Sequence, residues 1–339
     1  MEQSLVMNKT LEKIDFVVTY LDSTDKKWQE ERAKYSGEKL DSRNSEARYR
    51  NMDNFQYWFR AIERYAPWVN KIHLVTWGHV PEWLDTTNPK INIVKHDDYI
   101  PKEYLPTFNS NVLDLNLDRI PGLSENFVYF NDDIFLNSKT EPSDFFKNNL
   151  PLYQYMYTPV LPVDAFNSVI FNNSLTINQL PINKKFITKK SLSIKNGAKA
   201  VLFNIYLSPL IALLKRHIGF YPTHLARPLK KEAFRELREY VLEPFDKTSQ
   251  NKFRTHEDIS ILLLEDYLKI TGRFYPCNIK KVGLYQEIND TVDYKKILES
   301  DIKLICFNDT DNTENFEKVK TQLNQALADK FSEKSSYEL

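Results

Sequence analysis

Short apolar runs alternate with segments of helical periodicity through the first part of the chain. Residues 14–21 are rich in β-branched and aromatic side chains, which is typical of a buried strand, and apolar residues then recur at helical spacing over 55–65 until Pro67. The other elements predicted here are strands over 71–76, 91–94 and 126–130 and a helix over 109–119, with Ser110 as a possible N-cap. Strands and helices that alternate at this spacing predict an α/β fold with a mostly parallel sheet flanked by helices.

The second half of the chain is more helical. Residues 150–222 show no clear period and contain two proline-marked turns. Helical patterns follow over 231–243, 259–270 and 315–331, and a last strand is expected over 303–307. No linker rich in Gly, Pro or Ser divides the chain. We therefore expect one domain over 12–312, with a less regular insertion at about 150–222, and a C-terminal amphipathic helix within 313–339.

Composition narrows the possible function. Lys and Arg number 46 and so do Asp and Glu, so no net positive charge attracts nucleic acid. Cys277 and Cys306 form no CxxC pair and cannot build a disulfide framework. Among only 7 glycines there is neither a dinucleotide fingerprint nor a P-loop. If the protein binds nucleotide phosphates, it does so without a glycine-rich loop.

The sequence also bears on location. Residues 1–13 lack the apolar run of a signal peptide, and the longest apolar stretch, 201–214, is interrupted by Asn204 and Pro209 and is too short to cross a bilayer. We expect a cytoplasmic protein, with peripheral contact at the inner membrane face left open. The C-terminal amphipathic helix is a candidate for that contact, although packing in the core is the simpler use of its apolar side chains.

Two acidic turns follow predicted strands. Asp22 and Asp25 come after the first strand, and Asp132 and Asp133 follow the strand over 126–130. In parallel sheets, ligands bind beyond the carboxyl ends of the strands. A divalent cation such as Mg²⁺ or Mn²⁺ would offset the repulsion between Asp132 and Asp133. The alternative is that these residues form ordinary Asx turns and helix caps.

Three further residues could do chemistry. His224 lies between two prolines in a stiff segment, and as a histidine it suits a general base, although a loop or core role is the alternative. Arg254 could clamp a phosphate. Asp258 lies three residues after Thr255, which approximates a capping box, so this segment could equally be a helix start.

Taken together, these segments show a family resemblance. The chain resembles the Stealth proteins, capsular and exopolysaccharide phosphotransferases related to the catalytic subunit of N-acetylglucosamine-1-phosphotransferase. The resemblance lies in four blocks, in family order, which cover about half of the chain: 14–25, several motifs between 48 and 135 that end in Tyr-Phe-Asn-Asp-Asp-Ile-Phe, 224–258 and 305–310.

The resemblance implies a Rossmann-like, GT-A-like sheet and a specific reaction. A hexose 1-phosphate, or N-acetylhexosamine 1-phosphate, would pass from a UDP-sugar donor to a hydroxyl of an oligosaccharide or lipid-linked glycan acceptor, with release of UMP. It also implies residue roles. Asp132 and Asp133 would bind Mg²⁺ or Mn²⁺. The catalytic set would be His224, Arg254, Asp22 and Asp258, and Asp25, Arg48, Arg50, Asn109 and Asn308 would bind the donor.

Two other functions remain possible from the sequence. A metal-dependent glycosyltransferase could use the same acidic pair on the same kind of sheet, but it would release UDP. A non-catalytic glycan-binding or scaffold subunit is the alternative from another class, and it would not need the acidic pair and His224 together.

Overall fold

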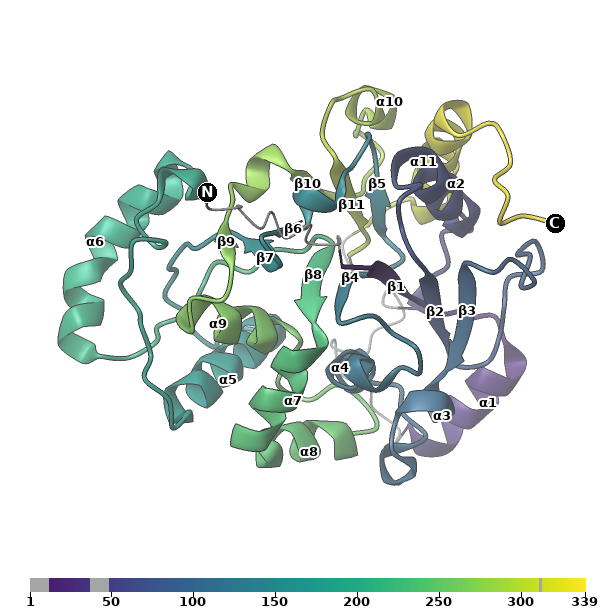
Figure 1. The fold of residues 1–339 in the computed structure, drawn as a ribbon. Coiled ribbons are helices and arrows are strands. Elements are labelled where there is room, and N and C mark those ends of the chain that lie inside the picture. Colours follow the sequence, from purple (N-terminus) through teal and green to yellow (C-terminus); the bar gives the residue numbers. More distant parts are fainter. Residues whose placement is uncertain (1–11, 37–48, 311–312) are drawn as a thin grey trace, which may run out of the picture.

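The computed structural model describes residues 12–36, 49–310 and 313–339. Its central sheet has the strand order β3-β2-β1-β4-β8. The first four strands are parallel, and β8 joins β4 as an antiparallel edge strand (Figure 1). The strands span Ile14–Tyr20 (β1), Ile72–Thr76 (β2), Ile91–Lys95 (β3), Asn126–Phe130 (β4) and Arg227–Lys230 (β8). The predicted α/β fold with a mostly parallel sheet is confirmed.

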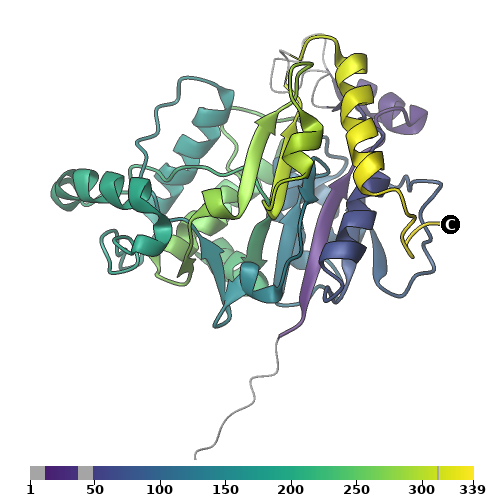
Figure 2. The ribbon, with the colours of Figure 1, turned by 90° about the horizontal axis from the view of Figure 1, so that it is seen from above.

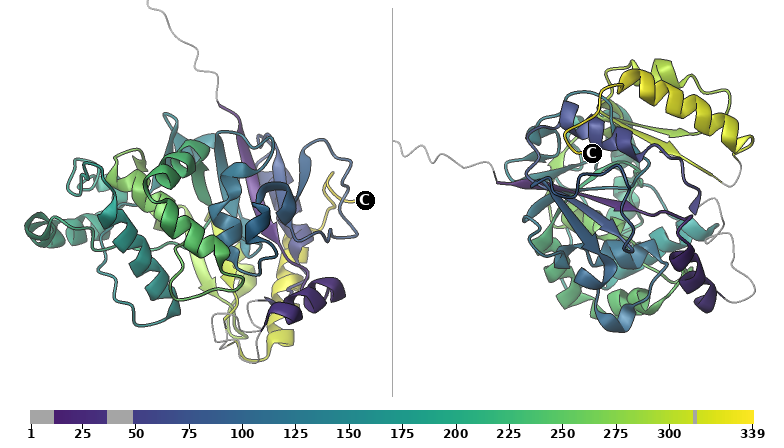
Figure 3. Two further views of the ribbon diagram at one scale, coloured as in Figure 1. Left: turned by 90° about the horizontal axis from the view of Figure 1, so that it is seen from below. Right: turned by 90° about the vertical axis from the view of Figure 1, so that its right-hand side faces the viewer.

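Side chains alternate along β1 between two apolar cores, because successive residues of a strand point to opposite faces. Phe16 and Val18 belong to the core under α2 (Phe55–Tyr65) and α11 (Phe316–Lys330), whereas Val17 belongs to the other core. The second core is covered by helices that include α4 (Ser110–Leu115), α7 (Lys231–Tyr240), α8 (Leu242–Gln250) and α9 (Leu262–Ile270). Figure 3 shows α2 and α11 together on one side of the sheet.

Two small sheets extend the central one. β5 (Ile134–Leu136) follows the turn after β4 and pairs with β11 (Leu304–Asn308), which in turn pairs with β10 (Gly283–Glu287). The third sheet contains β6 (Phe146–Lys147), β7 (Leu150–Tyr153) and β9 (Tyr275–Pro276). The β5–β11 pairing brings a C-terminal strand against the acidic turn at Asp132–Asp133, far from it in the sequence.

The insertion between β7 and β8 contains two long helices, α5 (Ala165–Gln179) and α6 (Ala198–Leu214). Neither shows a clear apolar stripe in sequence: α5 is rich in Asn, Ser and Thr, and α6 is apolar on nearly all sides. This explains why the sequence pattern predicted a less regular region. The other helices are α1 (Lys26–Tyr35), α3 (His96–Tyr99) and α10 (Tyr294–Leu298).

Three predicted helices differ in extent from those observed. The helix expected over 109–119 ends at Leu115, where the Asn116 side chain donates to the carbonyl of Val112 and a 3₁₀ turn follows. The helix expected over 231–243 breaks at Val241 into α7 and α8. The helix expected from 259 begins at Leu262.

The C-terminal helix α11 packs into the protein. Its apolar residues Val319, Leu323 and Leu327 are buried in the core that it shares with α2. Of the two uses considered for this helix, the structure shows core packing. Nowhere in the described chain is a helix both long and apolar enough to cross a membrane.

Candidate active site

The two acidic turns lie at one edge of the central sheet. β1 and β4 pair directly and run parallel, so both end at the same edge, as the sequence predicted. Asp22 and Asp25 follow β1, and Asp132 and Asp133 follow β4. Burial raises the pKa of Tyr20, the last residue of β1, to about 12, and the negative charges of Asp22 and Asp132 add to this rise.

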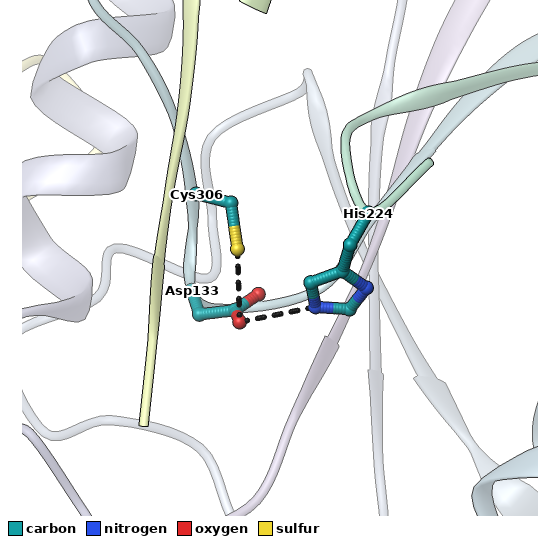
Figure 4. A group of neighbouring side chains, drawn as sticks. All are labelled: Asp133, His224 and Cys306. Atoms are coloured by element: carbon teal, nitrogen blue, oxygen red, sulfur yellow. Dashed lines mark hydrogen bonds and ion pairs between the residues drawn. The ribbon is translucent and has the colours of Figure 1, made fainter. Parts of the chain in front are cut away.

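His224 and Asp133 are in direct contact at this edge. Nε2 of His224 lies 3.3 Å from Oδ2 of Asp133, and Sγ of Cys306 lies 3.3 Å from the same oxygen (Figure 4). His224 comes from the segment before β8, and Cys306 comes from β11, where it pairs with Ile134. Because a carboxylate can only accept, it favours the imidazole tautomer with hydrogen on Nε2 and a free lone pair on Nδ1.

The carboxylates of this turn are poorly satisfied by the protein itself. Oδ1 of Asp133 is buried and has no hydrogen-bond partner. Asp132 is an exposed residue, but desolvation of its carboxyl raises the pKa to about 7, and the nearby negative charge of Asp133 adds to this rise. An orphaned carboxylate oxygen beside a second carboxyl fits a cation that prefers oxygen ligands.

Cys306 adds a sulfur atom to this group of side chains. Asp133, His224 and Cys306 each offer one ligand atom within 4.8 Å of the others, a donor set of oxygen, nitrogen and sulfur that would suit zinc. Metals bind the thiolate form of cysteine, however, and burial together with Asp133 raises the pKa of the Cys306 thiol well above its usual range. In the structure the thiol donates to Oδ2 of Asp133, and cation binding by the oxygen atoms of Asp132 and Asp133 stays a prediction.

Arg254 and Asp258 belong to a second cluster, built against the N-terminus of α4. Nε and Nη2 of Arg254 donate to Oγ of Ser110 at 3.1 and 2.7 Å. Asp258 is fully buried and accepts from side-chain amides at 2.7–3.2 Å and from Thr255. The backbone N–H of Thr255 donates to Asp258, which is one half of a capping box, but the Thr255 hydroxyl donates to the same carboxylate and no helix starts there, because α9 begins only at Leu262.

Asn109 shares this supporting position. Its side chain is fully buried; the amide donates to Asp258 and the carbonyl oxygen caps α4 by accepting from the backbone of Asn111. The amide nitrogen and oxygen of Asn109 and both carboxylate oxygens of Asp258 already form hydrogen bonds within the protein. This geometry favours a role in which the two residues hold the loop of Arg254 against α4, and it disfavours direct contact with a substrate. Direct catalytic or donor-binding roles for these two residues stay predictions.

The turn after β1 satisfies its own carboxylates locally. Asp22 accepts from the backbone and hydroxyl of Thr24, and Asp25 caps α1 by accepting from two backbone N–H groups. The pKa of Asp25 is lowered, chiefly by its hydrogen bond from the backbone of Trp28. The backbone N–H of Asp22 donates to Nε2 of His79, whose Nδ1 lies 3.5 Å from Asp25. Asp22 and Asp25 therefore form the Asx turn and the helix cap that the sequence left open as alternatives. Further roles of these two residues in the reaction remain predictions.

The remaining donor-binding candidates lie near β11. Arg50 forms an ion pair with Asp309, in which Nη2 donates to Oδ1 at 3.1 Å and Nε lies 2.9 Å from Oδ2, and its guanidinium lies over the ring of Phe316. Asn308 ends β11, and the backbone N–H of the preceding residue, Phe307, donates to the backbone carbonyl of Asp133 at 2.9 Å. Arg48 lies outside the described residues.

Two residues near the site were missed by sequence reasoning. Cys306 lies in the family block 305–310, and the sequence alone assigns no role to it. Asp114 lies on the buried face of α4, and Tyr129 donates to its Oδ1 at 2.7 Å. Burial raises the pKa of Asp114 to about 6, although Tyr129 and the positive charges of Arg254, Arg227 and His224 oppose this rise. A carboxylate between the apolar residues Val112 and Leu115 was the signal that could have revealed it.

Comparison with known proteins identifies the family. The family model described as Stealth protein CR2, conserved region 2, matches residues 48–152. The capsular polysaccharide phosphotransferase WcwK of Streptococcus pneumoniae is 42% identical over 96% of this chain and 98% of its own length. The receptor polysaccharide phosphotransferase WefC of Streptococcus oralis is 36% identical over 97% of this chain and 100% of its own.

Solved structures are more distant. The galactosyltransferase LgtC is 9% identical, with 93% of this chain and 96% of that one covered and a TM-score of 0.42. The sequence relatives decide the class: they are named polysaccharide phosphotransferases, and they match over nearly their full length. This chain belongs to the Stealth family, as its sequence blocks indicated.

Proposed function

We propose that the protein transfers hexose 1-phosphate, or N-acetylhexosamine 1-phosphate, from a UDP-sugar to a hydroxyl of a growing cell-surface polysaccharide. The product is a phosphodiester, and UMP is released. The observation that supports this most directly is the contact between His224 and Asp133 beside the second carboxyl of Asp132. This arrangement provides a base for a hydroxyl next to carboxylates suited to the cation of a diphosphate.

In this reaction the acceptor oxygen attacks the β-phosphorus of the donor. The new bond joins that oxygen to the phosphorus, and the bond from the β-phosphorus to the oxygen bridging to the α-phosphate breaks. That oxygen leaves with its electron pair as part of UMP. The sugar's C1–O bond remains intact, so the anomeric configuration is kept. Catalysis therefore requires positioning and charge stabilisation at phosphorus.

His224 is the proposed general base. With Asp133 accepting from Nε2, the lone pair of Nδ1 can take the proton of the acceptor hydroxyl, and Asp133 stabilises the imidazolium that forms. The second ring nitrogen points away from Asp133 (Figure 4). Arg254, fixed on Ser110, supplies positive charge for the phosphate oxygens of the donor.

Asp132 and Asp133 would hold Mg²⁺ or Mn²⁺ through their oxygens. Such a cation neutralises charge on the diphosphate when bound. The acceptor in this proposal is an oligosaccharide or lipid-linked glycan, and the reaction takes place in the cytoplasm.

The nucleotide product tests the proposal. The purified protein is incubated with candidate UDP-hexoses, a glycan acceptor and Mg²⁺ or Mn²⁺, and UMP is separated from UDP. Acceptor-dependent UMP is the expected result, because attack at phosphorus leaves the β-phosphate on the sugar. Acceptor-dependent UDP would mean attack at carbon, and a metal-dependent glycosyltransferase would replace the proposal. Donor binding with neither product, under conditions in which a relative such as WcwK turns over, would indicate a non-catalytic subunit.

A further inference from the structure

Helix α6 presents apolar side chains to solvent over much of its circumference. Leu202, Tyr206 and Leu213 are 66%, 82% and 80% exposed. At 100° per residue they form one stripe along the helix, opposite the stripe that faces the protein. The inward stripe consists of Ala200, Asn204, Leu207 and Ile211. Exposed apolar surface of this extent on one element marks an interaction site.

Helix α6 is firmly attached to the rest of the protein although its outer face is exposed. The side-chain amide of Asn204 donates to the carbonyls of Tyr155 and Ser191 at 2.8 and 2.6 Å, and its oxygen accepts from the backbone N–H of Tyr157 at 2.9 Å. These bonds fix α6 on the strand-like segment after β7. The helix is therefore docked through its inner stripe, and its outer apolar stripe is left without a partner among the described residues.

The segment that carries α6 is strongly basic. Residues 165–231 contain nine Lys and two Arg and no Asp or Glu, in a chain whose positive and negative residues balance at 46 each. Several of these cations are exposed, and none of the exposed ones pairs with a carboxylate in the part of the chain that the structure describes. They are Lys185, Lys189, Lys195, Lys199, Lys215 and Arg216.

The surface lies at one end of the molecule. α6 is the element farthest from the central sheet in both Figure 1 and Figure 2. Other exposed apolar residues lie in the loops around it, among them Ile194, at 87% exposure. Residues 215–223 lead from the end of α6 to His224, so this surface is joined to the candidate base by a short segment.

We propose that α6 and the loop before it, residues 185–216, dock on an anionic lipid bilayer, with α6 lying in the plane of the interface. An exposed apolar stripe flanked by Lys and Arg matches the acyl and headgroup layers of such a surface. A second copy bound through the same face would oppose like charges without neutralising acids. The proposal goes beyond the proposed reaction, because it does not depend on which bond the site breaks.

Flotation with lipid vesicles tests this proposal on the full chain. The wild-type protein is mixed with vesicles of phosphatidylglycerol and phosphatidylcholine, or of phosphatidylcholine alone. We expect binding to the anionic vesicles, weakened by salt. The variant K199Q/K215Q/R216Q should lower the partition coefficient on the order of a hundredfold. The variant L202Q/Y206Q/L213Q should lower it at least about tenfold, since it removes apolar groups that enter the interface.

A matched control removes three exposed lysines elsewhere on the surface, as K71Q/K295Q/K296Q, and should bind like the wild type. Release of UMP with a water-soluble acceptor should be unchanged in all three variants, so a failed reaction and a failed docking surface are told apart. Absence of flotation, equal flotation with neutral vesicles, or equal loss in the control variant would overturn the proposal. A dimer that only L202Q/Y206Q/L213Q dissociates would also overturn it and assign the face to a second copy.

Discussion

Tyr129 in β4 donates its hydroxyl hydrogen to Oδ1 of Asp114 in α4 at 2.7 Å, and both residues are buried. The carboxyl of Asp114 also feels the positive charges of Arg254, Arg227 and His224. Asp114 therefore interacts electrostatically with both Arg254 and His224. Burial nevertheless raises the pKa of Asp114 from 3.8 to about 6, so keeping this carboxylate ionised in the folded protein costs stability.

This cost predicts a stability change in Asp114→Asn. Because the folded-state pKa is the higher one, the folded protein binds more protons between these two values. The contribution of Asp114 to the unfolding free energy therefore falls as pH rises from about 4 to about 6, and it stays low at higher pH. Relative to wild type, Asp114→Asn should gain on the order of 2–3 kcal/mol in unfolding free energy between pH 4 and pH 8. Urea unfolding at both pH values measures this.

Asp97→Asn is the control for that experiment, since Asp97 is an exposed carboxyl on α3. This variant reports what removal of a surface carboxyl does to the unfolding free energy at each pH. If the pH profiles of Asp114→Asn and wild type run parallel, Asp114 does not carry the shifted pKa.

A second prediction concerns the base. His224→Gln removes the nitrogen that accepts the acceptor proton, while glutamine can still donate an amide hydrogen to Asp133. We expect kcat for UMP release to fall roughly 10²- to 10⁴-fold, with the unfolding midpoint little changed because His224 is partly exposed. His256→Gln is the matched control, since the side chain of His256 is exposed nearby in sequence to Arg254. A His224→Gln enzyme within threefold of wild type would remove His224 as the base.

The sequence predicted the sheet well because its strands are marked locally. β1, β2 and β4 are apolar runs that end in polar turns, and their parallel pairing follows from the helices between them. The position of the two acidic turns at one edge of the sheet was predicted in the same way, because two neighbouring parallel strands end there. The contact of His224 with Asp133 was less accessible, because the residues are 91 positions apart and nothing in the local pattern pairs them.

Other features depend on tertiary context. Asp258 reads as a helix cap in sequence, yet its carboxylate accepts from side-chain amides in two distant segments, Asn109 and Asn111 at the start of α4 and Asn251 after α8. Cys306 reads as an ordinary buried strand residue, and only the β5–β11 pairing brings it to Asp133. α6 gave no periodic signal because its outer face is as apolar as its inner one. In each case the deciding partner is distant in sequence or absent from the chain.

A third prediction separates the two possible donor sets at the acidic turn. Asp133→Asn removes a charged oxygen and should raise the concentration of Mg²⁺ or Mn²⁺ needed for half-maximal UMP release by at least about tenfold. Cys306→Ala should change that concentration less than about threefold, because the thiol donates to Asp133 and the expected ligands are carboxylate oxygens. Titration of chelator-treated enzyme with each metal gives both values. A Cys306→Ala shift as large as that of Asp133→Asn would mean that sulfur binds the metal.

The last prediction concerns stability in mild acid and rests on His96, in α3. The imidazole is buried, its Nδ1 has no hydrogen-bond partner, and burial lowers its pKa to about 3. The unfolded chain takes up this proton below about pH 6.5, whereas the folded protein stays neutral until about pH 3. Stability is therefore lost as pH falls through this window, by about 2 kcal/mol at pH 5 from this one group.

His96→Phe keeps a ring of similar shape and cannot titrate, so its unfolding free energy relative to wild type should rise by that amount between pH 7.5 and pH 5. Comparing this difference at two pH values cancels any change in packing that the substitution causes. Parallel stability curves for the two proteins would show that His96 is protonated, or free to become so, in the folded state.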